Sequence, residues 1–299
     1  MDYGANNMTV PLTVNNDLIL SGSLSASGAA GGDIIVRGNW NKTGSFFPNA
    51  RAVFFQGTNA QTFTGATTFD YVLIDKTAGS FTLNNDFTSN QTLTFTATNT
   101  VNITTGSNKV IISNTGSVAR TGSGHVYGNL QKNIPTGTNS RTFEVGDASV
   151  YAPVITAYTG VTGAGDITVN TTVNDHPQIA TSTINAAKSV NRFYTITNSG
   201  VTGGSYDGTF TFVSGDVDSG AITANFIVNN YVNPTWSTTT TGTRTSTTTQ
   251  ATGLTVYGDF QVGEPGTVTT TWTAGASTTA WTTAGNWSNG VPTSSTNVI

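Results

Sequence analysis

The carboxylates between residues 8 and 131 are the groups of this sequence best suited to acid–base chemistry. They are Asp17, Asp33, Asp70, Asp75 and Asp86. Glycan cleavage requires two carboxylates, or a carboxylate with a basic partner, in one groove. Here each aspartate stands alone among turn residues, and Asp17 and Asp86 lie 69 residues apart in bends of similar sequence. The pattern favours carboxylates that bond turn backbone, and it predicts no catalytic residue.

The two histidines, His125 and His176, lie in no catalytic motif. The sequence has no Gly-x-Ser-x-Gly elbow, no phosphate-binding Gly-x-x-x-x-Gly-Lys loop and no metal-type histidine spacing. We therefore expect both histidines to have structural or surface roles, and we predict no cofactor.

One loop, Asp216-Val217-Asp218-Ser219-Gly220, has the spacing of a weak extracellular calcium site. Calcium takes six or more oxygen ligands, and the loop offers only two carboxylates. The sequence predicts no resident metal and leaves weak calcium binding at Asp216 and Asp218 open.

Four tryptophans, Trp236, Trp272, Trp281 and Trp287, are candidates for a platform on which sugar rings stack. Their regular setting favours buried packing instead. Thr and Ser hydroxyls could carry O-linked glycans, but nothing in the sequence marks a position for them.

The composition limits the class of protein. Charged residues make up 9% of the 299 residues and the net charge is −4, so no basic patch favours nucleic acid. Cysteine is absent, which excludes disulfides and thiolate metal sites.

No apolar run approaches the ~18 residues of a membrane span. Residues Met1–Ala5 lack the parts of a signal peptide, so an extracellular chain of this composition is expected to be a piece of a longer one.

A three-residue motif of mostly apolar residues that favour β-strands recurs at nearly even intervals through the first 112 residues. Its copies begin at Leu18, Ile34, Val53, Val72, Leu93 and Val110, which are 16, 19, 19, 21 and 17 positions apart. A period near 20 residues is typical of a solenoid, so we predict a right-handed parallel β-helix over residues 1–131. An antiparallel sandwich is the alternative, but the motifs are uniform and the bends lack hairpin dipeptides such as Asn-Gly.

Longer strands and longer connections follow the solenoid. Seven candidates lie at 142–145, 152–158, 166–173, 190–197, 208–213, 225–231 and 254–262. They predict an immunoglobulin-like β-sandwich over residues 132–266. Its expected core aromatics are Phe143, Phe193, Phe210, Phe212, Phe226, Tyr231 and Phe260. The Thr-rich stretch 236–250 is expected to be an exposed edge hairpin or a loose loop.

Residues 267–299 form a third segment, with three tryptophans within sixteen residues. We expect it to start or cap a further repeat, with a new strand at Asn297-Val298-Ile299.

The spacing Trp272-Thr-Ala-Gly-Ala-Ser-Thr-Thr-Ala-Trp281 and the following Asn286-Trp287 resemble a segment of very large secreted surface proteins of Bacteroidota. Three further stretches, 258–264, 188–194 and 143–147, resemble other parts of the same proteins. The resemblance implies a cell-surface or extracellular location, export by the type IX route, and an adhesin-like or filament-forming role.

The combined expectation is an all-β structural and adhesive repeat module that acts as a stiff spacer and assembly unit. Its expected partners are other copies or neighbouring repeats, stacked end to end, and surface glycans. The alternative is a carbohydrate-binding module or a β-helix enzyme that degrades polysaccharides.

Overall fold

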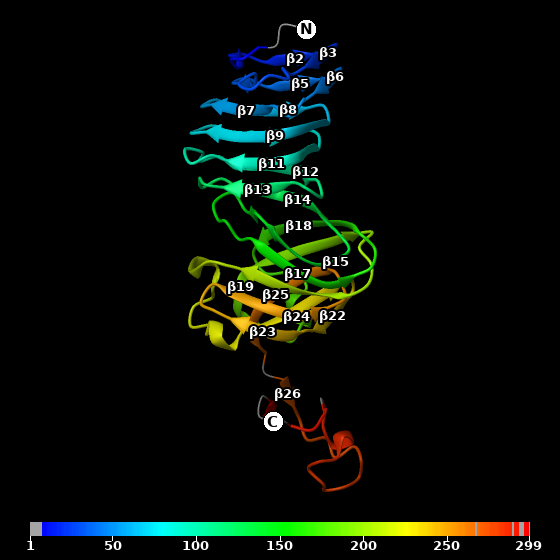
Figure 1. The fold of residues 1–299 in the computed structure, drawn as a ribbon. Coiled ribbons are helices and arrows are strands. Elements are labelled where there is room, and N and C mark those ends of the chain that lie inside the picture. Colours follow the sequence, from blue (N-terminus) through cyan, green and yellow to red (C-terminus); the bar gives the residue numbers. More distant parts are fainter. Residues whose placement is uncertain (1–7, 267, 289, 293–295, 299) are drawn as a thin grey trace.

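The computed structural model describes residues 8–266, 268–288, 290–292 and 296–298, and within them the protein is all-β. Met1–Ala5 and Ile299, on which two of the expectations rest, lie outside the described residues. Figure 1 shows stacked strands at the N-terminal end, a second β domain below them, and the C-terminal segment at the opposite end. No helix among the described residues is long and apolar enough to cross a membrane.

The first domain is a parallel β-helix of about six turns, as predicted. Its strands form three faces. Face 1 holds β1 (Leu12–Val14), β4 (Ile34–Val36), β7 (Ala52–Gly57), the ends of β9 (Thr67–Lys76) and β11 (Phe87–Phe95), and β13 (Ser117–Arg120). Face 2 holds β2 (Leu18–Leu20), β5 (Trp40–Lys42), β8 (Gln61–Thr64), β10 (Phe81–Leu83), the starts of β12 (Ile103–Ile112) and β14 (Val126–Ile134), and β16 (Val145–Gly146). Face 3 holds β3 (Ser23–Ser25), β6 (Ser45–Phe47), the starts of β9 and β11, and the ends of β12 and β14.

The register corrects the period of the solenoid. Along face 1, Leu12, Ile34, Val53, Val72, Leu93 and Val118 stand in consecutive rungs, so the steps are 22, 19, 19, 21 and 25 residues. The period read from the sequence was shorter because it mixed faces: Leu18 lies on face 2 and Val110 on face 3. Alternation within each short strand still points the same apolar residues inward.

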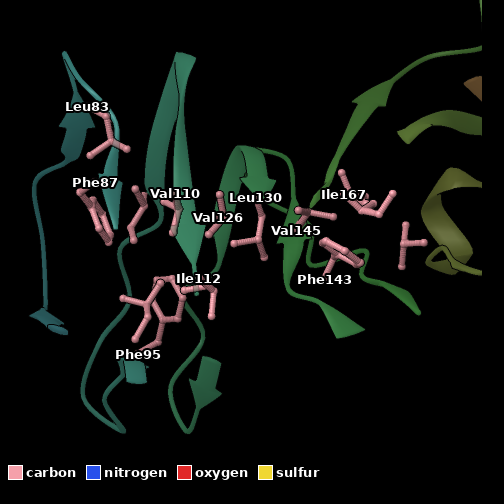
Figure 2. Packing of buried hydrophobic residues seen from close by; sticks show 14 of the residues in the cluster. Leu83, Phe87, Phe95, Val110, Ile112, Val126, Leu130, Phe143, Val145 and Ile167 are labelled. Atoms are coloured by element: carbon pink, nitrogen blue, oxygen red, sulfur yellow. The ribbon is translucent and has the colours of Figure 1, made fainter. Parts of the chain in front are cut away.

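The solenoid interior is a column of aliphatic and aromatic side chains. The alternating positions Phe81, Leu83, Leu93, Phe95, Val101 and Ile103 are all buried, as predicted. Phe69 is fully buried, with its ring centroid 5.1 Å from that of Trp40, 6.1 Å from Phe55 and 6.0 Å from Phe87. Figure 2 follows this apolar column from Leu83 to Val145 and Ile167, across the boundary into the second domain.

The two domains share a strand. β14 pairs in parallel with β12 from Val126 to Lys132, and its second part also pairs antiparallel with β18 (Gly165–Val173), with Leu130 opposite Val169. After β15 (Gly137–Phe143), the chain returns to the solenoid as β16, which adds a short strand to face 2. The C-terminal end of the β-helix is therefore closed by strands of the second domain.

The second domain consists of two antiparallel sheets. One continues from β14 and β18 through β19 (Ile184–Ser199), β25 (Gly258–Pro265), β21 (Ile227–Val232) and β22 (Thr235–Thr238). The other has the order β15, β17 (Val154–Val161), β20 (Ser205–Thr211), β24 (Thr248–Leu254) and β23 (Thr240–Arg244). Short 3-10 turns lie at η1 (Ile179–Thr181), η2 (Ser214–Asp216), η3 (Thr223–Asn225) and η4 (Ala284–Asn286). The sheets pack face to face, since Phe210 of β20 contacts Tyr194 of β19 and Phe260 of β25.

Two of the predicted core aromatics, Phe193 and Tyr231, are only half-buried. On β19 the inward residues are Arg192, Tyr194 and Ile196, so Phe193 points to the other side of the sheet. The other five predicted aromatics are fully buried. The Thr-rich stretch forms an edge: β23 and β24 pair as a hairpin at the end of the second sheet.

In the C-terminal segment, β26 (Val268–Thr270) pairs in parallel with β27 (Thr296–Val298), with Val268 opposite Thr296. The three tryptophans lie in the connection between these strands and pack on one another, but Trp272 and Trp281 are exposed, contrary to the expectation of buried packing. Trp287 is buried, with its ring centroid 4.9 Å from Trp272 and 4.5 Å from Trp281. A parallel pair joined by a long connection is the same unit that builds each turn of the first domain.

Candidate functional site

The aspartates of the solenoid lie at its corners and bind the neighbouring rung. Four of them accept a backbone N–H: Asp17 from Asn39 at 2.8 Å, Asp33 from Ala52 at 2.9 Å, Asp70 from Ala50 at 2.7 Å and Asp86 from Lys109 at 2.8 Å. Asp75 instead accepts the hydroxyls of Thr96 and Thr98, both at 2.6 Å. Each carboxylate thereby joins one turn to the next. Asp17 and Asp86 lie at separate corners, whereas Asp33 and Asp70 bind the same corner, at residues 50–52, from the rungs on either side of it.

The N–H of Asn39 lowers the pKa of Asp17, because the bond favours the ionised carboxylate. For Asp75, burial raises the pKa, but hydrogen bonds from Thr96, Thr98 and Gln56 outweigh it, so its pKa is lowered. Such carboxylates stay ionised, whereas a general acid needs a raised pKa.

Asp17 and Asp86 do not occupy equivalent corners, contrary to the sequence interpretation. Asp17 follows β1 and lies between faces 1 and 2, whereas Asp86 follows β10 and lies between faces 2 and 3. The repeated motif is therefore rotated by one face. Both copies still place the aspartate where it accepts an N–H from the next rung.

The corner between face 1 and face 2 also buries a lysine that the sequence analysis did not single out. Lys76 has no exposed surface, and its Nζ donates to the carbonyls of Asn59 at 2.8 Å and Gly57 at 3.2 Å. Burial lowers the pKa of Lys76 to about 8. Among the described residues no carboxylate bonds this amine, and it donates to two carbonyls of the previous turn.

The two histidines lie in separate structural settings. His176 accepts the N–H of Gln178 at Nδ1 (3.1 Å) and bonds Asp259 through Nε2 (3.1 Å). Its ring packs against Phe193 and Trp236 on the outer side of the first sheet. The half-buried aromatics and Trp236 thus form a cage around an imidazole, and Trp236 also donates to the carbonyl of Gln178 at 2.9 Å.

His125 lies at the last turn of the solenoid, where its Nε2 is 2.7 Å from the carbonyl oxygen of Asp147. The glycine at position 146 is required here: a Cβ would lie 2.5 Å from His125 Nε2 and 2.2 Å from the carbonyl of Val150. Burial lowers the pKa of His125. The carbonyls of Asp147 and Ser123 favour the charged ring and oppose this change, but burial outweighs them.

The lowered pKa of His125 predicts that acid destabilises the junction of the two domains. In the unfolded chain the His125 imidazole binds a proton near pH 6.5, whereas in the folded chain it binds the proton only at lower pH. Stability is therefore full above about pH 6.5 and falls as the pH drops towards the folded pKa. We expect the melting temperature to fall between pH 7.5 and 5, and to fall less in His125→Gln. Equal slopes in the wild type and in His125→Gln would contradict the prediction.

The Asp-x-Asp loop holds internal bonds at both carboxylates. Asp218 accepts the N–H of Ser189 and the amide of Asn191, both at 2.8 Å. Asp216 turns the other way, towards Arg192. Among the described residues no three His, Asp or Glu side chains gather as a metal ion would require.

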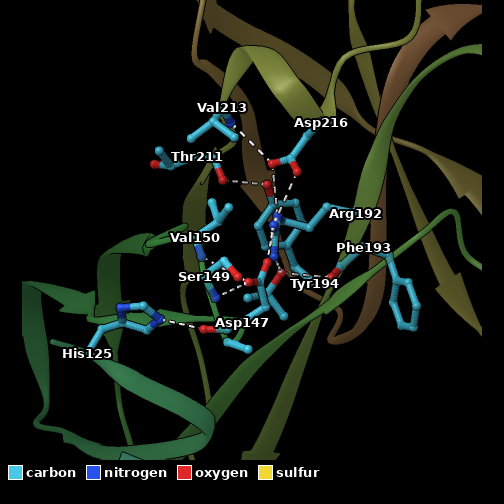
Figure 3. Close-up of polar contacts among 12 residues, drawn as sticks. His125, Asp147, Ser149, Val150, Arg192, Phe193, Tyr194, Thr211, Val213 and Asp216 are labelled. Carbon is cyan, nitrogen blue, oxygen red and sulfur yellow. Dashed lines mark hydrogen bonds and ion pairs between the residues drawn. The ribbon is translucent and has the colours of Figure 1, made fainter. Parts of the chain in front are cut away.

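A buried ionic network joins the two domains, and Figure 3 shows it. Arg192 has no exposed surface; its Nη2 lies 2.5 Å from Asp147 Oδ2, and its Nε lies 3.0 Å from Asp216 Oδ2. Asp147 belongs to the segment that returns to the solenoid, and it also accepts the N–H groups of Ser149 and Val150. Burial raises the pKa of Asp147, but these bonds and Arg192 outweigh it and hold the pKa below its ordinary value.

A second buried pair lies beside the first. Lys132 of β14 contacts Glu144 at 2.7 Å, and both side chains are about nine-tenths buried. Burial lowers the pKa of Lys132 and raises that of Glu144, because each charge loses water, while their mutual attraction opposes both changes. The stretches 143–147 and 188–194 thus meet at this junction through Asp147 and Arg192.

Comparison of the chain with models of known protein families, with curated proteins and with solved structures gave no match.

Proposed function

We propose that this chain is one period of a large secreted surface protein of the kind found in Bacteroidota, exported by the type IX route. In that protein it acts as a stiff spacer and assembly unit outside the cell, and no reaction is assigned to it. We also propose that the β-helix is right-handed, as crossover connections between parallel strands nearly always are. The second domain is proposed to have immunoglobulin-like topology, since its two antiparallel sheets pack face to face over one core.

The observation that carries the proposal is the unbroken sheet between the domains. Hydrogen-bonded pairs run from the first rung through β14 into β18, β19, β25 and β21. A flexible linker allows neighbouring domains to move independently. Here a shared strand, a common apolar column and two buried ion pairs take the place of a linker. These contacts favour a fixed orientation of the two domains relative to each other.

The two ends of the unit support stacking of one repeat on the next. In β2, the N–H of Leu18 bonds Asn39 and the carbonyl of Leu20 accepts from Thr43, so the alternation of a parallel strand directs the N–H and C=O of Ile19 outwards. A hollow of about 430 Å³ lined by Leu12, Val14, Leu18, Leu20 and Leu24 lies at the same end. At the other end, β26 and β27 already form a parallel pair. We propose that β27 of one unit continues into, or docks on, the first rung of another.

Light scattering and electron microscopy of the purified chain over a range of concentrations test the intermolecular form of this proposal. We expect end-to-end oligomers. Ile19→Pro removes an outward N–H from the edge and should give monomers, whereas the control Ile19→Val keeps that N–H and should still associate. A wild-type chain that remains a compact monomer at high concentration would exclude stacking between copies.

The alternative function is a glycan-degrading β-helix. It requires paired carboxylates in a groove. Asp17 and Asp86 are bonded at separate corners, and Asp33 and Asp70, two rungs apart at one corner, each accept a backbone N–H of the rung between them. Incubation with plant and algal polysaccharides, followed by analysis of reducing ends, tests it. Release of oligosaccharides by the wild-type chain would replace the spacer proposal with an enzymatic one.

A further inference from the structure

Two neighbouring hollows lie where the solenoid meets the second domain, and both are lined by Tyr127. The first, of about 460 Å³, is lined by Gly106, Tyr127, Gly128, Asn129, Asp147 and residues 170–173 of β18. The second, of about 240 Å³, is lined by Gly79, Ser80, residues 100–102, Thr104, Tyr127 and Ala148. The first volume lies within the range of small-ligand sites, and because the two hollows share Tyr127 in their lining, we treat them as one groove.

The position of Tyr127 follows from the strand it occupies. Val126 points into the solenoid core, so Tyr127 points outward, and it is 39% exposed. Its neighbours in register on face 2 are Thr104 on one rung and Gly146 on the next. Because the turn at His125 admits only glycine at position 146, no side chain of that residue covers the ring.

Two corner glycines keep the first hollow open. Gly106 has a φ of +57°, and a Cβ built on it would meet no atom within 4 Å. Gly128 has a φ of +118°, and a Cβ there would lie 2.1 Å from the hydroxyl of Thr105. The corner therefore carries no side chain at these positions, and Asn170–Val173 of β18 form the facing wall.

The polar groups of the groove are mostly uncharged. The hydroxyls of Tyr127, Thr104 and Thr172 bond no other group within the described part of the chain, whereas Asn170 uses its amide nitrogen on Asn129 at 2.9 Å. Asp147 is the one carboxylate among the lining residues of the two hollows, and it is bonded to Arg192. The lining contains no Lys or Arg, so no fixed cation in it favours an anionic ligand.

We propose that this groove binds a neutral saccharide, with one pyranose ring stacked on Tyr127 and adjoining units in the two hollows. The apolar face of a pyranose matches an exposed aromatic ring, and its hydroxyls both donate and accept hydrogen bonds. The hydroxyl and amide groups of the groove can likewise both donate and accept hydrogen bonds. A fixed cation or an unpaired carboxylate would instead favour an ionic ligand. The site is independent of the proposed stacking, since it lies at the domain junction and not at either end.

Calorimetric titration with neutral hexasaccharides of the xylan, mannan, laminarin and chitin series tests the proposal. We expect at least one series to bind and Tyr127→Ala to weaken it at least tenfold, which corresponds to about 1.4 kcal/mol. Tyr127→Trp should retain binding, because it keeps a stacking surface. Tyr71→Ala is the matched control: Tyr71 is 37% exposed and lines neither hollow, so this variant should bind as the wild type does.

Circular dichroism spectra and melting curves establish that each variant is folded before titration. Failure of all four series to bind at millimolar concentration would overturn the proposal. Equal affinity of wild type and Tyr127→Ala would place the saccharide elsewhere and overturn it as well. Because the readout is ligand affinity and not assembly, neither result depends on whether the chains stack.

Discussion

Replacing Arg192 by leucine is expected to reduce the free energy of unfolding by about 3–5 kcal/mol. The guanidinium is fully buried and bonds Asp147 and Asp216, both of which are nearly buried themselves. Without it, two carboxylates remain in a site of low polarity with only backbone donors to stabilise them. Because Asp147 belongs to the segment that completes the solenoid, we expect the loss to loosen the junction of the domains.

Thermal and guanidinium unfolding measure this effect. Lys188→Leu is the matched control, since Lys188 lies on the same strand but is partly exposed and bonds only the carbonyl of Ser219. Adding Asp147→Asn and Asp216→Asn to the Arg192 variant should recover part of the stability, because the buried charges are then gone. If Arg192→Leu unfolds at the same midpoint as Lys188→Leu, the network does not stabilise the junction.

Replacing Phe69 by alanine is expected to cost about 3–5 kcal/mol in the solenoid. Its ring contacts those of Trp40, Phe46, Phe55, Phe63 and Phe87, which belong to several successive turns. A solenoid turn contacts only its neighbours, so a cavity here interrupts the single column that joins them. The expected consequence is early unfolding of the turns on the N-terminal side of the cavity.

Hydrogen exchange resolved along the chain detects that pattern, and denaturant unfolding measures its size. Tyr71→Ala, on the same strand with an exposed side chain, should change the midpoint little. Uniform exchange along the whole solenoid in the Phe69 variant would mean that its turns unfold as one unit, and it would contradict the prediction that the N-terminal turns unfold first.

The sequence was sufficient to predict the β-helix because its signal is local. Short apolar motifs must point alternate residues inward, whichever face they occupy, so Phe81, Leu83 and Ile103 were identifiable as core residues. The assignment of each motif to a face was not predictable, since the three faces use the same residue types. Leu18 and Val110 were therefore placed in one series with Ile34, although they lie on different faces.

The junction was harder to predict because its partners are distant in sequence. Phe193 was predicted to lie in the core, whereas the structure buries its neighbour Arg192 instead. This arrangement is stable because Asp147, 45 residues earlier, and Asp216, 24 residues later, neutralise the buried charge. Likewise Tyr127 drew no attention in the sequence, because its setting between two hollows depends on glycines at three corners and on a strand of the next domain.

The orientation of the rungs determines how the chain responds to tension. Hydrogen bonds between rungs run along the axis of the solenoid, and the first rung and the segment from β26 onwards lie at opposite ends of the molecule (Figure 1). A pull between these ends therefore loads the rungs in series, and the outermost rung separates first. Each rung that opens releases the 19 to 25 residues between successive strands of face 1, which extend to about 60–85 Å. The proposed spacer would thus lengthen under load in discrete steps and dissipate the energy of a sudden pull.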